Sequence, residues 1–338
     1  MQTKPISTQL TEILNISFPI IMAPMFLVSN VAMTEAAMEA GIAGAFPSLN
    51  YRKEGELETV LDTLNASQKN KIGTYGINLI VQQTNPLYKK HLKICVEKKV
   101  PFYITSLGSP KEVIEQAHAY GGKVFCDVTN IAHAKKCFDL NCDGFIAVGQ
   151  GAGGHAGPFP LQVLIPSLHQ HFPEKPVVAA GGIANGKGIL SMLALGAAGV
   201  SIGTRFIAST EATVKMEYKN AIVDSKMEDI VLTERISGTP CTIINTPFAK
   251  KIGYKQNMIE RFLSKNKTTK KYFKMLVQIK GMKELEASVK PGNYDTLWCA
   301  GQSVELIETI SSCKEIIEKL KQETFSEYEG LKKCFSER

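Results

Sequence analysis

The sequence lacks a long hydrophobic run. Its longest apolar stretch covers residues 18–28 and is interrupted by Pro19 and Pro24, whereas a helix that crosses a membrane needs about 20 apolar residues. The first residues alternate polar with apolar side chains and show neither a basic segment before an apolar one nor a small-residue cleavage site. We therefore expect a cytoplasmic protein with no membrane span.

The chain also lacks paired cysteines. Its eight cysteines are scattered over residues 95–334 with no C-x-x-C and no paired Cys/His spacing, which argues against structural zinc and iron–sulfur clusters. We predict no metal site. Because free cysteine is among the most buried residue types, we expect reduced, buried thiols.

Acidic residues are scarce in one segment. The formal net charge is +7, but residues 250–290 alone hold twelve Lys and Arg against three Glu, a local balance of +9. Such a patch could attract an anionic substrate or an acidic carrier protein. The alternative is a solvated, lysine-rich helical face. We expect no nucleic-acid partner, because the segment has few aromatic residues and no known binding motif.

Short apolar runs alternate with longer amphipathic ones from residue 18 to about residue 225. This is the pattern of repeated β–α units around a parallel sheet. The predicted strands are 19–23, 43–46, 75–79, 102–105, 124–127, 144–148, 177–180 and 200–202. The predicted helices are 34–40, 55–66, 86–98, 110–119, 131–138, 161–171, 186–195 and 209–222.

Eight buried strands that do not alternate in polarity favour a closed α/β fold, the (β/α)8 TIM barrel, over an open doubly wound sheet, which is the alternative. The rhythm breaks after residue 225. We therefore predict a barrel over residues 1–225, a basic and mainly helical insertion over 226–300, and a closing helix and tail over 301–338. The closing helix is expected from about residue 303 to 321.

Glycines stand directly after two predicted strands, at the end where barrel enzymes carry their chemistry. Gly181 and Gly182 follow the seventh strand, and Gly203 and Thr204 follow the eighth. A missing Cβ lets backbone N–H groups approach a ligand, and these two loops are the recurrent phosphate site of the fold. The alternative is that the glycines only make tight turns.

The ends of the first and sixth strands are also distinctive. At the first, a proline that cannot donate to a strand ladder is followed by Met25, a soft apolar surface for a flat ring, although such residues are often plain core. Residues 149–158 hold five glycines and one imidazole, His155. A group that titrates near neutral pH suits proton transfer at this face. We predict that His155 is catalytic, with a structural histidine as the alternative.

Together these strand ends resemble the nitronate monooxygenase family of FMN-dependent TIM-barrel enzymes. The similarity runs from about residue 19 to 212, with a weaker echo at residues 298–303. The segments that carry it are Ala23-Pro24-Met25, Gly76-Ile77-Asn78-Leu79, Ala152-Gly153-Gly154-His155, Ala180-Gly181-Gly182-Ile183 and Gly203-Thr204-Arg205-Phe206.

The resemblance implies FMN as the cofactor. No G-x-G-x-x-G fingerprint follows an early strand, which also favours FMN over a dinucleotide. The residues implied to line or hydrogen-bond the flavin ring are Ala23, Pro24, Met25, Asn78, Ala152 and Gly153. Those implied to hold the phosphate are Gly181, Gly182, Gly203 and Thr204, and His155 would be the acid or base that faces the substrate.

One position departs from the family pattern. Asp127 stands where several relatives place Lys or Gln near the pyrimidine edge of the flavin. A carboxylate there would disfavour an anionic reduced flavin, which leaves the reaction open. The alternative is that Asp127 points away, toward Asn130 or the start of the next helix as a cap.

The activity that the resemblance implies is oxidation of a nitronate or other stabilised carbanion by FMN, with O2 as the second substrate. The alternative is an NAD(P)H-dependent flavin reductase of the enoyl-ACP or quinone reductase type, since such enzymes resemble the same motifs. The basic segment would then suit an acidic acyl carrier protein. A third hypothesis is a barrel without enzymatic activity that binds an acidic partner.

Overall fold

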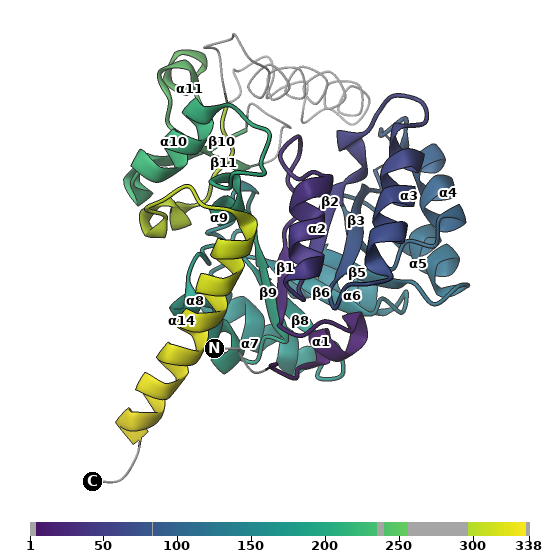
Figure 1. The fold of residues 1–338 in the computed structure, drawn as a ribbon, viewed down its shortest axis with the longest axis horizontal. Coiled ribbons are helices and arrows are strands. Elements are labelled where there is room, and N and C mark those ends of the chain that lie inside the picture. Colours follow the sequence, from purple (N-terminus) through teal and green to yellow (C-terminus); the bar gives the residue numbers. More distant parts are fainter. Residues whose placement is uncertain (1–4, 83, 235–239, 256–296, 336–338) are drawn as a thin grey trace.

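The computed structural model describes residues 5–82, 84–234, 240–255 and 297–335. Within them, eight parallel strands close into a barrel in the order β1-β2-β3-β4-β5-β6-β8-β9, with helices around it (Figure 1). The predicted (β/α)8 TIM barrel is confirmed, and the open sheet is wrong, because Ile21 of β1 pairs with Ala43 on one side and Ser201 on the other. The barrel strands are β1 (Ile20–Met22), β2 (Ala43–Pro47), β3 (Thr74–Ile80), β4 (Phe102–Ser106), β5 (Lys123–Val128), β6 (Gly144–Val148), β8 (Val177–Ala180) and β9 (Gly199–Ile202).

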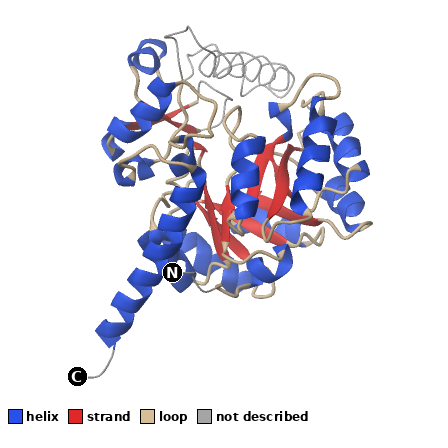
Figure 2. Ribbon diagram, in the orientation of Figure 1, coloured by secondary structure: helices blue, strands red, loops and turns tan. Residues whose placement is uncertain are grey.

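Helices follow the strands and cover the outside of the barrel (Figure 2). Three of them begin at an asparagine cap: Asn30, Asn130 and Asn185 each accept a hydrogen bond from the backbone N–H three residues further on. The helices are α1 (Gln9–Leu14), α2 (Val31–Glu39), α3 (Glu56–Gln68), α4 (Tyr88–Glu97), α5 (Lys111–His118), α6 (Ile131–Phe138), α7 (Leu161–His171), α8 (Gly186–Ala194), α9 (Thr204–Ile207), α10 (Met216–Asp224), α11 (Pro247–Ile252) and α14 (Cys313–Phe335). Short 3-10 turns are η1 (Ser48–Asn50), η2 (Met227–Asp229) and η3 (Gln302–Leu306).

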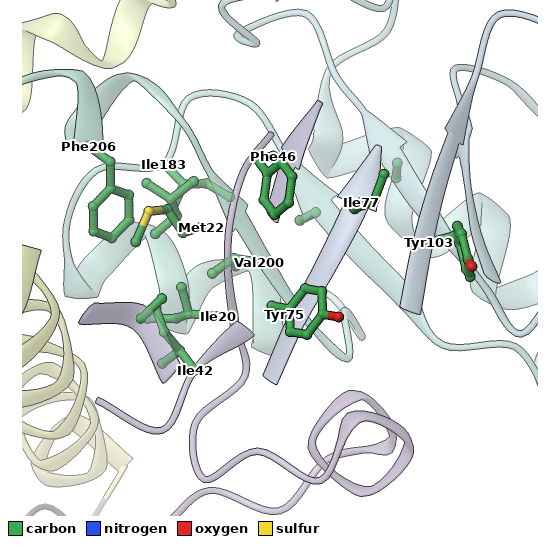
Figure 3. Close-up of a cluster of buried hydrophobic side chains, with 14 of the residues drawn as sticks. Ile20, Met22, Ile42, Phe46, Tyr75, Ile77, Tyr103, Ile183, Val200 and Phe206 are labelled. Carbon is green, nitrogen blue, oxygen red and sulfur yellow. The ribbon is translucent and has the colours of Figure 1, made fainter. Parts of the chain in front are cut away.

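The barrel strands bury both of their faces. Residues such as Ile104 and Phe125 pack together inside the barrel. The residues that alternate with them along each strand, such as Tyr103, pack outward under the helices. Figure 3 shows part of this outer cluster, in which Met22 and Tyr75 are labelled. Because no strand face meets water, the strands read in the sequence as continuous apolar runs.

Two glycines make room for aromatic rings inside the barrel. A Cβ on Gly76 would lie 2.4 Å from the Phe102 ring, and a Cβ on Gly144 would lie 2.5 Å from the Phe125 ring. The two rings meet edge to face with their centroids 6.5 Å apart, and both are fully buried. The barrel is therefore a packed core, and its chemistry is confined to the mouth at the carboxyl ends of the strands.

A small second sheet lies beside that mouth. Strands β10 (Ile230–Thr233) and β11 (Cys241–Ile244) pair antiparallel, and β11 also pairs with β7 (Gly154–His155), a two-residue strand in the loop after β6. The described part of the expected helical insertion thus contains strands as well as helix α11. Residues 256–296, with most of the basic segment, lie outside the described residues, and the three domain ranges stay predictions.

The closing helix begins later than predicted. Helix α14 starts at Cys313, not near residue 303. Residue 303 lies in the short 3-10 turn η3, and between η3 and α14 the chain is held extended: Ser311 N donates to Ala208 O at 3.3 Å, and Ser311 O accepts from Thr210 N at 3.0 Å. The same pairing delays α10, which was expected to begin at residue 209. Helix α14 then packs along α8 and continues beyond the barrel (Figure 1).

Six of the eight cysteine side chains are buried, as expected, while Cys299 is partly exposed and Cys334 is exposed near the end of α14. In the part of the chain that the structure describes, no group of three or more His, Cys, Asp or Glu side chains is placed to hold a metal ion. None of the helices in those ranges combines the length and the apolar character that a membrane crossing requires.

Candidate active site

Three polar side chains form a hydrogen-bonded row across the carboxyl ends of β3, β4 and β5. The Asn78 amide donates to Ser106 Oγ at 2.8 Å and to the Ile104 carbonyl at 3.1 Å. The Ser106 hydroxyl donates to the Asp127 carboxylate. Ser106 and Asp127 lie two residues beyond the interior residues Ile104 and Phe125 on their strands. Because strand side chains alternate between the two faces, the row faces into the mouth of the barrel.

The opposite half of the mouth is apolar. Strands β6 and β8 end there with Val148 and Ala180, which pack against the interior cluster and are partly exposed, as are Ser106 and Asp127. We call the surface made by Asn78, Ser106, Asp127, Val148 and Ala180 the floor of the site. It suits a flat molecule with one polar edge.

The charge of Asp127 depends on pH near neutrality. Burial raises the pKa of Asp127 to about 6, and the hydrogen bond from Ser106 opposes this rise because it favours the carboxylate. Asp127 does not cap α6, because the Asn130 side chain takes that role by accepting from His133 N at 2.8 Å. The interpretation of Asp127 as a helix cap is therefore wrong.

The turn after β1 forms a partly exposed wall beside the floor. Ser29 Oγ donates to Ala23 O at 3.2 Å and accepts from Met25 N at 2.9 Å. Asn50, in η1 after β2, donates to Met25 O at 3.3 Å and accepts from Leu27 N at 2.8 Å. Two polar side chains thus fix the orientation of the residues that were predicted to line a ring.

The glycines after β8 lie against the loop that follows β6. Gly181 has φ +124°, and a Cβ there would lie 2.7 Å from Ala152 N. Gly182 donates its N–H to Gly151 O at 3.0 Å. The structure thus brings the predicted residues Ala152, Gly181 and Gly182 together. Because Gly181 and Gly182 have no side chains, the loop after β6 can pack directly against their backbone. Neither the phosphate interpretation nor the tight-turn interpretation included this role.

The start of α9 lies next to the end of β1. A Cβ on Gly203 would make ordinary contacts with Ala23 Cβ at 3.5 Å and with Met25 Sδ at 3.7 Å. Thr204 is buried, and its Oγ1 accepts from Gly301 N at 3.1 Å. Among the described residues the Thr204 hydroxyl has no acceptor for its own proton, so it could donate to a phosphate oxygen.

Strand β11 clamps the glycine-rich loop after β6. Thr242 Oγ1 lies 2.5 Å from Ala152 O, to which it donates, and 3.4 Å from Gly154 O. On another side of the loop, a Cβ on Gly153 would lie 2.8 Å from Gly301 N. The loop is therefore held between β11 and the chain segment before η3.

His155 lies in β7, at the end of this loop. Its backbone pairs with Cys241 of β11, and its side chain reaches solvent at the mouth. The protein around the imidazole nevertheless disfavours its charged form, so desolvation lowers the pKa of His155. A neutral imidazole accepts protons, which fits the acid/base role predicted for this residue.

These features fit a phosphorylated planar ring such as FMN. The floor offers one polar edge and one apolar half, the turn after β1 offers a wall, and Thr204 offers a free donor proton among the described residues. One predicted contact fits less well, because the Gly182 N–H already donates to the loop after β6.

Sequence reasoning did not single out several contributors to this site. Ser106 and Asn50 come directly after or shortly after the apolar runs of β4 and β2, so the strand-end rule would have found them. Thr242 reaches the site from a distant part of the chain, and no local pattern marks it. Gly301 lies in the segment that showed the weaker echo of the family, but its contact with Thr204 was not predicted.

Comparison with known proteins identifies the family of this chain and similar folds. Residues 48–323 match the model of the family described as nitronate monooxygenase. A (3aS,4S,5R,7aS)-5-hydroxy-7a-methyl-1-oxo-octahydro-1H-indene-4-carboxyl-CoA dehydrogenase of Rhodococcus jostii is 26% identical, with 96% of this chain and 97% of that protein aligned. A probable nitronate monooxygenase of Staphylococcus saprophyticus is 28% identical over 94% of this chain and 98% of that protein. The solved structure of FabK from Thermotoga maritima superposes with a TM-score of 0.84 at 30% identity, over 98% of this chain and 100% of that one.

Proposed function

Because the chain belongs to the nitronate monooxygenase family, we propose that it is an FMN-dependent oxidoreductase that oxidises alkyl nitronates with O2. The observation that carries the proposal is the mouth itself: a half-polar floor, and an exposed imidazole on a glycine-rich loop, whose pKa is lowered by desolvation. FMN, when bound, supplies the electron transfer between the substrate and O2.

The remaining tasks belong to the chain. In this proposal the ring rests on the floor with its polar edge toward β3–β5, and His155 accepts a proton from the carbon of a neutral nitroalkane or donates a hydrogen bond to an ionised nitro group. The residues proposed to contact the ring are Ala23, Pro24, Met25, Asn78, Asp127, Ala152 and Gly153. Those proposed for the phosphate are Gly181, Gly182, Gly203 and Thr204, with Gly182 contributing only if its N–H leaves Gly151 O.

The second candidate is an NAD(P)H-dependent flavin reductase. The observation that favours it is the similarity along nearly the whole chain to a carboxyl-CoA dehydrogenase, an oxidoreductase by name that acts on a thioester. A thioester substrate would bring a large anionic carrier to the mouth of the barrel, and the basic segment 250–290 would suit it electrostatically.

Anaerobic mixing of the purified, flavin-loaded protein separates these functions. Bleaching of the flavin absorbance by a preformed alkyl nitronate, but not by NADH or NADPH, is the result expected of the proposed nitronate monooxygenase. Bleaching by NADH or NADPH would support the reductase instead. If neither bleaches the flavin, the barrel binds without catalysis. Extraction of FAD, or of no flavin, from the soluble protein would contradict the cofactor assignment.

A further inference from the structure

Asp127 has one hydrogen-bond partner among the described residues, the Ser106 hydroxyl, which reaches Oδ2. Ser106 in turn accepts from the Asn78 amide at 2.8 Å. Along this row, Asn78 donates to Ser106 and Ser106 donates to the carboxyl group, while the Asn78 amide also donates to the Ile104 carbonyl. The second carboxyl oxygen, Oδ1, is left for a molecule that occupies the floor.

The surroundings of Asp127 provide no countercharge. Strand β6 presents apolar side chains next to it, and β4 and β3 present only the neutral groups of Ser106 and Asn78. On α6, Asp127 acts on the Cys137 thiol: a hydrogen bond with Cys126 lowers the pKa of Cys137, burial and the charge of Asp127 raise it, and Lys136 lowers it. In the part of the chain that the structure describes, no Lys, Arg or His pairs with Asp127. Burial without a countercharge favours the protonated carboxyl group.

We propose that Asp127, oriented by Ser106, is a proton-bearing hydrogen-bond donor to the polar edge of the flavin ring, so that the protein binds flavin in proportion to the protonated form of this residue. The inference rests on the proposed FMN site. A neutral carboxyl group offers an O–H to ring acceptors, whereas a carboxylate offers only further acceptors. Flavin affinity should therefore fall as pH rises through the ionisation of Asp127.

Ser106 sets the pH at which this happens. Its hydroxyl donates to the carboxylate and so favours the ionised form, which opposes the effect of burial. Removing the hydroxyl should raise the pKa of Asp127 above about 6. The protein should then retain flavin at a higher pH. A residue with a merely structural role would not move this transition.

The experiment measures the dissociation constant of flavin by fluorescence quenching between about pH 5 and about pH 9. A phosphate monoester also titrates near pH 6, so riboflavin, which has no phosphate, is measured beside FMN. The proteins compared are wild type, Asp127→Asn, Ser106→Ala and, as the matched control, Asp139→Asn. Asp139 is an exposed carboxylate at the end of α6, paired with Lys135 outside the barrel.

We expect the riboflavin Kd of wild type and Asp139→Asn to rise by about tenfold per pH unit above about pH 6, from proton linkage. Asp127→Asn, always neutral, should show no such rise, and Ser106→Ala should show it at higher pH. If wild type and Asp127→Asn have the same pH profile with both flavins, the inference is overturned while the FMN proposal stands. If no protein binds either flavin at any pH, the FMN proposal fails and the inference fails with it.

Discussion

Replacing Gly181 by alanine tests what the glycine after β8 is for. The new Cβ would lie 2.7 Å from Ala152 N and 3.1 Å from the Gly151 carbonyl carbon, so one of the two backbones must move. The φ of +124° is also one that L side chains rarely adopt. Backbone strain costs about 1–3 kcal/mol and overpacking costs about 1–3 kcal/mol more. We therefore expect the free energy of unfolding to fall by about 2–6 kcal/mol.

The matched control is Gly121→Ala. Gly121 also has a positive φ, +89°, but a Cβ there would meet nothing within 4 Å. Gly121→Ala should therefore lower the free energy of unfolding only through backbone strain, by about 1–2 kcal/mol. Both variants are unfolded in urea without FMN, and their FMN retention is then measured separately.

The two measurements separate two reasons for the glycine. If Gly181 makes room for the loop after β6, Gly181→Ala is less stable than Gly121→Ala even without FMN. If it only makes room for a phosphate, the FMN-free variants lose similar stability, and Gly181→Ala alone fails to retain FMN. The second outcome would refute the reasoning from the Ala152 contact.

Three further variants test the rest of the site and the closing helix. His155→Asn should keep FMN but lose about 10²–10⁴ in rate with neutral nitroalkanes, and less with preformed nitronate; full activity on both substrates would make His155 structural. Thr242→Val, which leaves two loop carbonyls without their donor, should lower kcat with little change in KM, and Thr242→Ser should restore kcat. Thr233→Val is the same change on neighbouring β10 and serves as the control. If Thr242→Val lowers kcat no more than Thr233→Val does, Thr242 does not position the loop after β6. Gly186→Ala, whose Cβ would lie 2.3 Å from the α14 backbone, should lower the free energy of unfolding by about 1–3 kcal/mol. Gly188→Ala on the same helix should stay within about 1 kcal/mol of wild type, and equal losses would show that α14 does not constrain α8.

The barrel could be predicted because each strand is buried on both faces. A strand such as Val177–Ala180 reads as a continuous apolar run whatever its neighbours are. The start of α14 could not be predicted in the same way. Its first residues are decided by the pairing of Ser311 with residues 208–210, which are distant in the sequence, and helical periodicity contains no information about such a partner.

The same distinction holds for the site. Parallel strands bring their carboxyl ends to one face, so strand-end residues such as Gly181 and Gly203 could be selected without knowing any contact. Asn78 and Asp127 were selected only through the resemblance to the family. The sequence left open whether the Asp127 side chain points toward the flavin site or toward the start of α6. The cap that Asn130 forms on α6 excludes the second direction. Thr242 could not be found at all, because its hydroxyl reaches Ala152 across 90 positions through the pairing of β11 with β7.

The packed interior also determines how protons reach Asp127. Below the floor, the buried rings of Phe102 and Phe125 fill the barrel, so water has access to the carboxyl group only from the mouth. A ring that covers the floor would remove that water, and further desolvation favours the protonated form. The pKa of Asp127 must therefore be higher with flavin bound than without it, which is what linkage requires if the protonated form binds better. In the riboflavin titration, the pKa of Asp127 in the flavin-bound protein would appear as a second bend in the plot of affinity against pH. Above that pH the affinity stops falling. A single unbroken fall would mean that the flavin-bound protein keeps the proton on Asp127 over the whole titration, whereas no fall at all would mean that flavin binding does not raise the pKa of Asp127.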